Sequence, residues 1–375
     1  MIYLDNAATT HKKPLKTIFS VLKALTIYNA NPSRGSHTLS IKTSLKIEEC
    51  RENIKNFVNA PTTASVVYTY NCTEAINYAI QGTLNYGDHV IITTFEHNAV
   101  LRTLANLKQK NIDYSVVKPN TNGEITVKDI QKLQKNNTKM IIINQTSNVI
   151  GKTTDIYKIG KYCKENNILL LTDCAQSAGH KKINMTKNNI NFVALAGHKG
   201  LYGTQGIGAL IINNASPSPI KFGGSGSNSK SESMPDYYPD KLEAGTINVV
   251  GILALDAGIR FVQKKQEKIN KKIDKLSKIL IDYLKEEKNY ILYSQYDCCG
   301  VVSFNHRKIE TAHIVDELNK YNICVRGGLH CAPLAHSYIG TIDTGTVRVS
   351  ISYFNNKYEI KKLIKVLNKI NNKNR

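Results

Sequence analysis

The hydrophobic pattern of the chain between about residue 64 and residue 195 alternates short β-branched runs with longer amphipathic segments. The longer segments have the period of helices, and the short runs are typical of buried strands. Strands that alternate with helices predict an α/β fold with a mostly parallel sheet and helices on both faces. The predicted strands are Ser65 to Tyr70, His89 to Thr93, Tyr114 to Val117, Met140 to Asn144, Ile168 to Asp173 and Phe192 to Leu195.

The remaining chain has a different pattern and predicts a second domain. A loop rich in Gly and Ser, Phe222 to Ser233, is a candidate lid or a simple connector. A helical stretch from Val250 to about Glu287, formed by one or two helices, then leads to the second domain. The elements predicted beyond it are a strand near Val301 to Phe304, a helix from Thr311 to Lys320, strands near Ile323 to Arg326 and Val347 to Ser352, and a terminal helix.

Composition narrows the class of protein. With 375 residues, 41% of them apolar, the chain can bury a sizeable core in two or three domains of about 150 residues. The longest apolar stretches, such as Met140 to Ile143, are much shorter than the roughly 20 residues that span a bilayer. The first residues lack the basic and apolar regions of a secretory signal. We therefore expect a cytoplasmic protein without a membrane-spanning segment.

Charge and cysteine usage exclude further classes. The formal net charge of +21 would suit an acidic partner, but the basic residues are dispersed and gather only in Lys264 to Lys278 and Lys357 to Arg375. Because those two segments are expected to be solvent-exposed helices, we do not predict a dedicated nucleic-acid site. The eight cysteines include no Cys-x-x-Cys, so we predict reduced thiols without a metal site.

Lys199 and Asp173 are the strongest candidates for chemistry. Asp173 closes one predicted strand, and Lys199 follows the next strand between Gly197 and Gly200. In sheets of this kind, ligands bind beyond the carboxyl ends of the strands. An amine that can form a Schiff base and an acid that can hold a protonated ring nitrogen are what a pyridoxal 5'-phosphate (PLP) site requires. The pair therefore predicts PLP as the cofactor.

Four neighbouring residues have both a structural and a functional interpretation. Thr73, after a strand, either caps a helix or binds phosphate at the helix N-terminus. His97 is either a packed or capping residue, or a ring that stacks on the cofactor and moves protons. Gln176 can donate a hydrogen bond to the phenolic oxygen of the cofactor, and His198 can reach its phosphate.

Two candidates lie much later in the chain. Cys331 occupies a predicted loop, beside His330 and near Arg326, where positive neighbours would lower its pKa and favour the thiolate. Arg348 stands inside an apolar strand, where it either extends to solvent or clamps a carboxylate. The glycine-rich run Gly203 to Gly208 is weak as a dinucleotide motif, because a β-run follows it.

Segments along nearly the whole chain resemble the class V aminotransferase family of fold-type I PLP enzymes, and more closely the cysteine desulfurases. The resemblance implies a homodimer with a mostly parallel seven-stranded sheet in a large PLP-binding domain, residues 14–250. It implies a small α+β domain made of residues 1–13 and 251–375. The matching segments are Tyr3 to Thr10, Arg34 to His37, Asn71 to Glu74, Glu96-His97, Thr146 to Gly151, Asp173 to Gly179, Gly197 to Lys199, Glu243 to Thr246, Arg326 to Ala332, and Arg348.

The resemblance also implies a role for each matching residue. Lys199 would form the Schiff base and carry protons, Asp173 would pair with the ring nitrogen, and His97 would stack on the ring. Asn148 and Arg348 would bind the substrate amino acid. The implied cofactor contacts are Cys72, Thr73, Asp173, Gln176, His198 and Lys199, with Thr246 reaching in from a second subunit.

The implied reaction converts L-cysteine to L-alanine and transfers the sulfur. Cys331 would carry it as a persulfide to an acceptor protein that serves iron–sulfur cluster or thio-cofactor synthesis. The Arg-x-Gly-x-His-Cys-Ala segment resembles the type II, SufS-like branch. Two positions depart from the family pattern: Ala196 replaces a Ser or Thr, and Gly328-Leu329 replaces a polar or His-bearing pair.

Other activities remain open from the sequence. A selenocysteine lyase, a cysteine-sulfinate lyase or an aminotransferase of the same family would retain Lys199 and Asp173. A non-catalytic basic scaffold is the alternative from a different class.

Overall fold

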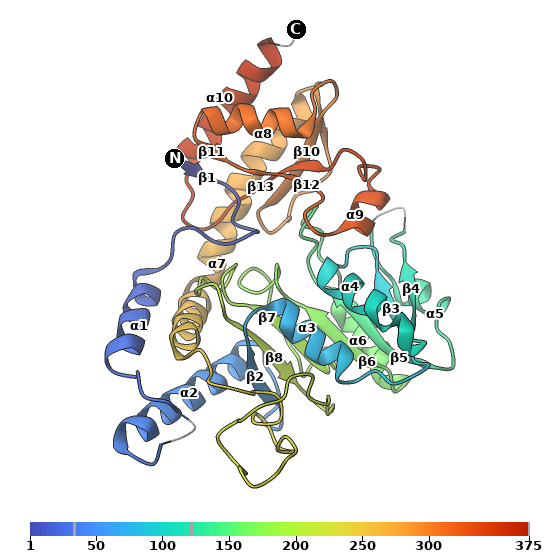
Figure 1. Ribbon diagram of the computed structural model, residues 1–375. Coiled ribbons are helices and arrows are strands. Elements are labelled where there is room, and N and C mark those ends of the chain that lie inside the picture. Colours follow the sequence, from blue (N-terminus) through green and yellow to red (C-terminus); the bar gives the residue numbers. More distant parts are fainter. Residues whose placement is uncertain (33–34, 121–122, 374–375) are drawn as a thin grey trace.

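The computed structural model describes residues 1–32, 35–120 and 123–373, so Arg34 of the Arg34 to His37 segment lies outside the described residues. Figure 1 shows a larger unit built on a broad sheet, with a smaller unit above it that contains both chain ends. None of the helices formed by the described residues is long and apolar enough to cross a membrane.

The described elements follow one another in chain order. The helices are α1 (Leu15–Thr26), α2 (Thr38–Phe57), α3 (Cys72–Gln81), α4 (Asn98–Leu107), the 3-10 turn η1 (Lys108–Lys110), α5 (Val127–Gln131), α6 (Ile156–Glu165), α7 (Val249–Glu286), α8 (Thr311–Lys320), α9 (Pro333–Tyr338) and α10 (Lys357–Lys373). The strands are β1 (Ile2–Tyr3), β2 (Ser65–Thr69), β3 (His89–Thr93), β4 (Asp113–Val117), β5 (Thr138–Asn144), β6 (Leu169–Asp173), β7 (Phe192–Ala196), β8 (Gly208–Ile212), β9 (Tyr290–Leu292), β10 (Val301–His306), β11 (Ile323–Cys324), β12 (Arg326–Gly328) and β13 (Thr346–Ser350).

The large sheet confirms the predicted α/β architecture. Within the described residues it has seven strands in the order β2-β8-β7-β6-β5-β3-β4. The only strand of this sheet that runs antiparallel to its neighbours is β8. The segment that joins β7 to β8 contains no helix, and a parallel return would require a longer crossover connection. All six predicted strands are present, with boundaries that differ by two residues or fewer.

Helices cover both faces of this sheet, as the alternation predicted. Along β5, Ile141 and Ile143 pack into one core with α2, α6 and the first half of α7. Met140 and Ile142 pack into the opposite core with α3 and α4. All four side chains are fully buried, and burying one such side chain is worth about 1.5–3 kcal/mol. A strand buried on both faces is therefore uniformly apolar rather than alternating.

The long helical stretch after the glycine-rich loop is a single helix, α7, of 38 residues rather than two. Asn248 caps it by accepting a hydrogen bond from the Gly251 backbone N–H at 2.9 Å. Its first half packs into the core of the large sheet, and its second half packs into the core of the small unit. The predicted domain boundary after residue 250 therefore falls near the start of a helix that both units share. The division into two domains remains a prediction.

The small unit combines a four-stranded sheet, in the order β12-β13-β10-β9, with the short parallel pair β1-β11. The strand predicted near Ile323 to Arg326 is in fact two strands in different sheets, because the chain changes partner after Cys324. Ile2 and Leu4 belong to the same core as the second half of α7, α8 and α10. The beginning of the chain is thus built into the small unit.

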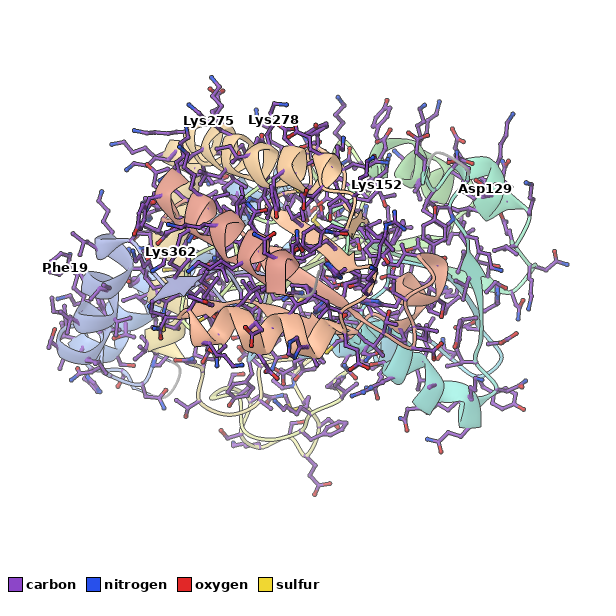
Figure 2. The ribbon with its side chains drawn as sticks, turned by 90° about the horizontal axis from the view of Figure 1, so that it is seen from above. Phe19, Asp129, Lys152, Lys275, Lys278 and Lys362 are labelled. Atoms are coloured by element: carbon purple, nitrogen blue, oxygen red, sulfur yellow. The ribbon has the colours of Figure 1, made fainter. Side chains whose placement is uncertain are left out.

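The basic segments lie on exposed helix faces, as predicted. Lys275 and Lys278 on α7 and Lys362 on α10 are exposed, and Figure 2 shows Lys275 and Lys278 at the outer edge of the molecule.

Candidate active site

The carboxyl ends of the parallel strands β2, β3, β5, β6 and β7 meet at one edge of the large sheet and border a cavity. This cavity contains every predicted site residue except Thr246, Cys331 and Arg348. Its lining residues are Asn71, Cys72, Thr73, Ile76, His97, Ala99, Asn144, Asn148, Asp173, Ala175, Gln176, Ala196, His198 and Lys199.

Asp173 and Lys199 lie together in this cavity. The Asp173 carboxylate is buried, and its Oδ1 accepts hydrogen bonds from the Ala175 N–H at 2.8 Å and from the Cys72 thiol at 3.5 Å. Burial lowers the pKa of the Lys199 amine, and the nearby Asp173 charge partly opposes that effect. The amine is thereby shifted toward its neutral form, which is the nucleophilic form.

His97 combines both of the interpretations that the sequence allowed. It is the N-cap of α4, where its Nδ1 accepts a hydrogen bond from the Ala99 N–H at 3.0 Å. Burial lowers its pKa to about 4, so the ring is neutral at pH 7. Because Nδ1 accepts, the proton of the neutral ring resides on Nε2. The His97 ring therefore lines the cavity as a hydrogen-bond donor, and its bond to Ala99 fixes its position.

The N-terminus of α3 corrects one alternative for Thr73. The cap is Asn71, whose Oδ1 accepts a hydrogen bond from the Glu74 N–H at 2.9 Å. Thr73 is an exposed residue of the first turn and does not cap the helix. Its hydroxyl and the helix N-terminus are thus available to an anion.

His198 and Gln176 are linked to the N-terminal segment that precedes α1. The His198 carbonyl accepts hydrogen bonds from the Thr10 hydroxyl at 3.0 Å and the Lys13 amine at 3.2 Å. The Gln176 Nε2 donates to the Ala7 carbonyl at 2.9 Å. Burial lowers the pKa of His198 to about 4. Its buried Nδ1 has no hydrogen-bond partner among the described residues.

The Cys331 loop lies outside the cavity but is fastened to its rim. The Cys331 carbonyl accepts a hydrogen bond from the Asn98 N–H at 2.7 Å, next to His97. The His330 carbonyl accepts one from the Asn148 side chain at 2.5 Å. His330 and Cys331 both have left-handed backbone angles, with φ of 48° and 60°. Such angles cost about 1–3 kcal/mol per residue and persist where the surroundings enforce them.

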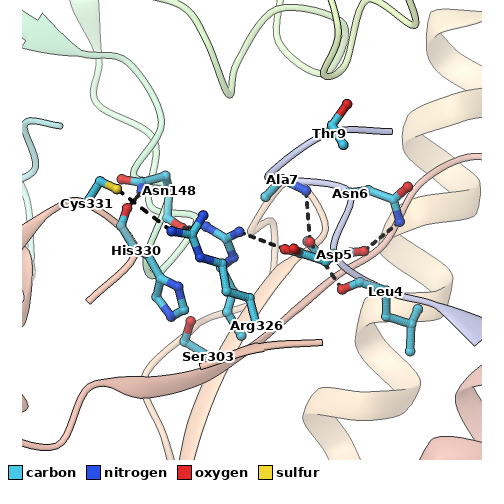
Figure 3. Close-up of polar contacts among 12 residues, drawn as sticks. Leu4, Asp5, Asn6, Ala7, Thr9, Asn148, Ser303, Arg326, His330 and Cys331 are labelled. Carbon is cyan, nitrogen blue, oxygen red and sulfur yellow. Dashed lines mark hydrogen bonds and ion pairs between the residues drawn. The ribbon is translucent and has the colours of Figure 1, made fainter. Parts of the chain in front are cut away.

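The positive charge beside Cys331 comes from Arg326 rather than from His330. The Arg326 Nη2 lies 3.8 Å from the Cys331 Sγ, as Figure 3 shows. The His330 ring is buried against Thr346, with its Nε2 3.1 Å from the Thr346 carbonyl. Burial lowers the pKa of His330 to about 2, so the ring carries no charge at neutral pH.

Arg348 does not extend to solvent, which excludes one of its two interpretations. Its side chain is 1% exposed, and its Nη2 forms an ion pair with the Asp5 carboxylate at 2.9 Å. Its Nη1 donates to the Asn148 carbonyl at 3.1 Å. The arginine therefore touches the backbone of a residue that lines the cavity. Its role as a clamp for a substrate carboxylate stays a prediction.

Thr246 is not among the residues that line this cavity. It borders a separate hollow beside Tyr70 and Lys221. A buried ion pair holds the segment before it, with Arg51 and Glu243 joined through two hydrogen bonds of 2.8 and 2.7 Å. The role of Thr246 toward a second subunit stays a prediction.

Sequence reasoning missed three contributors. It assigned no role to Lys13 or to Asp5, although Asp5 lies in the Tyr3 to Thr10 segment that matches the family. It also passed over Glu96, whose buried carboxyl accepts hydrogen bonds from the Thr93 hydroxyl at 2.7 Å and the Asn144 N–H at 2.9 Å. Burial raises the pKa of Glu96 to about 8. Glu96 thus links the ends of β3 and β5. In the sequence, the feature that could have identified it is its position next to His97.

Known proteins resemble the chain over its whole length. The family model described as "Aminotransferase class-V" matches residues 2–363. A probable cysteine desulfurase of Borreliella burgdorferi is 33% identical, across 99% of this chain and 92% of that protein. A cysteine desulfurase of Wigglesworthia glossinidia brevipalpis is 30% identical, with the same two coverages. The apo structure of a cysteine desulfurase from Thermococcus onnurineus superposes with a TM-score of 0.88 at 29% identity, covering 98% of this chain and 94% of that one. The chain belongs to the class V aminotransferase family.

Proposed function

We propose that this protein is a PLP-dependent cysteine desulfurase that converts L-cysteine to L-alanine and collects the sulfur on Cys331. One observation carries the proposal: the loop with Cys331 is hydrogen-bonded to Asn98 and Asn148 at the rim of the cavity that contains Lys199 and Asp173. The Cys331 thiol thus lies in a loop fastened beside the cavity that contains an amine and a buried carboxylate.

The residues of the cavity fit the cofactor. Asp173 supplies a buried carboxylate for the ring nitrogen, and Lys199 supplies an amine shifted toward its neutral form. The buried His198 Nδ1 lacks a partner among the described residues, and the N-terminus of α3 faces the same cavity, so both suit the phosphate. Ala196 contributes no hydroxyl there. When bound, PLP supplies an electron sink that weakens bonds at the substrate carbons.

The remaining groups would bind the substrate and move protons. Arg348, with its remaining N–H groups, would hold the substrate carboxylate, because a guanidinium matches a carboxylate in shape and charge. The Asn148 Oδ1 is buried without a partner among the described residues and would accept a hydrogen bond from the bound ligand. His97 would present its Nε2–H toward the reacting atoms, while Lys199 would carry the proton from the α-carbon.

Sulfur transfer would be a displacement at the substrate sulfur. The Cys331 thiolate forms a new S–S bond, the bond between the β-carbon and sulfur breaks, and the carbon keeps the electron pair and takes up a proton. The sum is L-cysteine plus the Cys331 thiol giving L-alanine plus a Cys331 persulfide. The Arg326 guanidinium lies 3.8 Å from the sulfur that makes this attack. An acceptor protein, or a thiol such as dithiothreitol, would then take the sulfur.

The proposal is tested by measuring alanine and sulfide released from L-cysteine in the presence of dithiothreitol. We expect equal amounts of the two products, and a persulfide on Cys331 by mass spectrometry when the thiol is omitted. Cys331→Ala should abolish sulfide release while keeping the bound cofactor. Cys324→Ala, which removes another partly buried thiol, is the matched control. Undiminished sulfide release from Cys331→Ala would exclude the persulfide step.

Other products would indicate a different member of the family. A keto acid product, with conversion of PLP to its amine form, would identify a transaminase. A strong preference for L-selenocysteine would identify a selenocysteine lyase. Stimulation of turnover by a small acceptor protein would support the predicted SufS-like branch.

The proposed enzyme is a homodimer. The first two helices expose apolar side chains that nothing in the described chain covers, and Figure 2 shows Phe19 at the outer edge of α1. The exposed residues are Leu15, Ile18, Phe19, Leu22 and Leu25 on α1, and Leu39, Ile41 and Leu45 on α2. A second copy would cover them and receive Thr246. Sedimentation should show a dimer for the native chain and a smaller species for Phe19→Glu/Leu22→Glu.

A further inference from the structure

The N-terminal segment Tyr3 to Thr10 matches the family pattern but has no role in the reaction as described so far. Its Asp5 lies against the arginine assigned to the substrate. We propose that Asp5 is a positioning residue, which fixes the Arg348 guanidinium for a substrate carboxylate. The inference rests on the proposed function, because it assumes that Arg348 binds that carboxylate.

Two contacts hold the guanidinium from different sides. Its Nη2 lies 2.9 Å from the Asp5 Oδ1, and its Nη1 donates to the Asn148 carbonyl at 3.1 Å. Asp5 and Asn148, both labelled in Figure 3, are the residues that supply these two contacts. Because the guanidinium is planar, two fixed nitrogens determine the orientation of the whole group.

The same guanidinium has a donor that no protein group uses. Its Nε is buried and has no hydrogen-bond partner among the described residues. A buried donor of a charged group is costly to leave unpaired, so its presence in a 1% exposed side chain points to a ligand atom. A carboxylate offers two acceptor oxygens and is the natural complement of the free N–H groups.

The surrounding charges explain why a carboxylate is needed at position 5. Arg326 and Arg348 stand directly opposite each other in the β12–β13 pair, where like charges repel. Arg326 faces Cys331, and Asp5 neutralises Arg348. The Asp5 backbone is itself fixed, since its carbonyl accepts hydrogen bonds from the Ala8 N–H and the Tyr3 hydroxyl, both at 3.2 Å.

The test compares two substrates that differ only in the carboxylate, L-cysteine and L-cysteine methyl ester. We expect Asp5→Ala to raise KM for L-cysteine about tenfold, the effect of weakening one charge-assisted hydrogen bond. Turnover of the methyl ester should stay within about twofold, because that substrate presents no carboxylate to orient. Asp5→Asn retains an acceptor oxygen, so its loss should be smaller, and it replaces Asp5→Ala should that variant not fold.

The matched control is Asp297→Asn, which removes an exposed carboxylate from its 2.6 Å ion pair with Lys181. It should leave the kinetic constants for both substrates unchanged. An equal loss for both substrates in the Asp5 variants would mean a purely structural role and would overturn the proposal. Absence of cysteine turnover in the native enzyme would instead contradict the proposed function. In that case Asp5 is tested by the rise in Tm of the holoenzyme when a ligand binds. Asp5→Asn should reduce the rise caused by L-alanine, which has a carboxylate, and should not change the rise caused by L-alaninamide, which has none.

Discussion

The cavity at the strand ends and the loop that carries Cys331 lie side by side, but they draw their residues from the chain in different ways. Most cavity residues lie at the carboxyl end of a strand of one sheet or shortly after it, so the parallel arrangement brings them together. The Cys331 loop is held by Asn98 and Asn148, which are far from it in sequence. A cavity of this kind follows from the architecture, whereas the position of the Cys331 loop depends on specific contacts between the two units.

The two regions also differ in how they treat charge. In the cavity, burial keeps His97 and His198 neutral and favours the neutral form of Lys199. Around the loop stand two arginines: Arg326 beside Cys331, and Arg348, which forms an ion pair with Asp5. The cavity suits proton transfer, and the loop suits anions: a thiolate and a carboxylate.

The largest expected effect breaks the cavity and spares the loop. Lys199→Ala should lower kcat by at least about 1,000-fold. It should also abolish the absorbance at about 420 nm that reports PLP bound to a lysine. Alkylation of Cys331 should be unchanged, because its loop is anchored by Asn98 and Asn148. Lys132→Ala, at an exposed lysine, is the control. Retention of that absorbance in Lys199→Ala would show that another residue holds the cofactor.

A second variant tests how much the buried ion pair that holds the Thr246 segment contributes to stability. Arg51→Met leaves the Glu243 carboxylate buried without its partner, which should lower the free energy of unfolding by about 3–5 kcal/mol. Lys55→Met, which breaks an ion pair with Glu52 on the same helix, should cost about 0.5 kcal/mol or less. Urea unfolding measures both. Equal losses would mean that the buried pair adds nothing beyond a surface pair.

A third variant acts on the contact between the Asn148 turn and the small unit. Gly151 has φ of 71°, and a Cβ there would lie 2.2 Å from the Cys298 carbonyl oxygen. Gly151→Ala should therefore push the Asn148 turn away from the small unit and raise KM for cysteine about 10- to 100-fold. PLP binding should persist. Gly87→Ala has similar backbone strain, with φ of 81°, but open space around its Cβ, and should leave KM unchanged.

The last comparison concerns the effect of pH on stability. Burial lowers the pKa of His97, His180 and His198 from 6.5 to about 4, so the unfolded chain binds more protons than the folded chain between those values. The stability they contribute is present above pH 6.5 and is lost as the pH falls toward 4. Urea unfolding across this range should show the slope, and His180→Gln, outside the cavity, should reduce it. An unfolding free energy that increases on acidification would contradict this account.

Much of the cavity could be predicted from the sequence, because β-branched runs mark buried strands and polar residues follow them. Asp173 and Lys199 were located in this way, and the topology of parallel strands predicted that they meet. The direction of β8 was outside that reasoning, since its apolar run resembles the parallel strands. Strands as short as β1 and β9 offer too few residues for a periodic pattern.

The contacts of the loop could not be predicted, because they join segments without a shared pattern. The Asn148 side chain reaches a carbonyl 182 positions away, and Arg348 reaches Asp5. His330 is neutral because it is buried against Thr346. The sequence shows only that His330 is next to Cys331, and this suggested a positive charge there. The roles of the site residues remain predictions for the experiments above.

The ion pair between Asp5 and Arg348 joins positions 343 residues apart, and this has a consequence for synthesis on the ribosome. The strands around the cavity and the first half of α7 emerge well before β13, and domains begin to fold N-terminal first. Asp5 leaves the exit tunnel 343 residues ahead of Arg348 and cannot meet this partner until β13 has emerged. A nascent chain can thus form the lysine cavity before the arginine exists, and a cofactor that binds it would stabilise a chain that is not yet an enzyme.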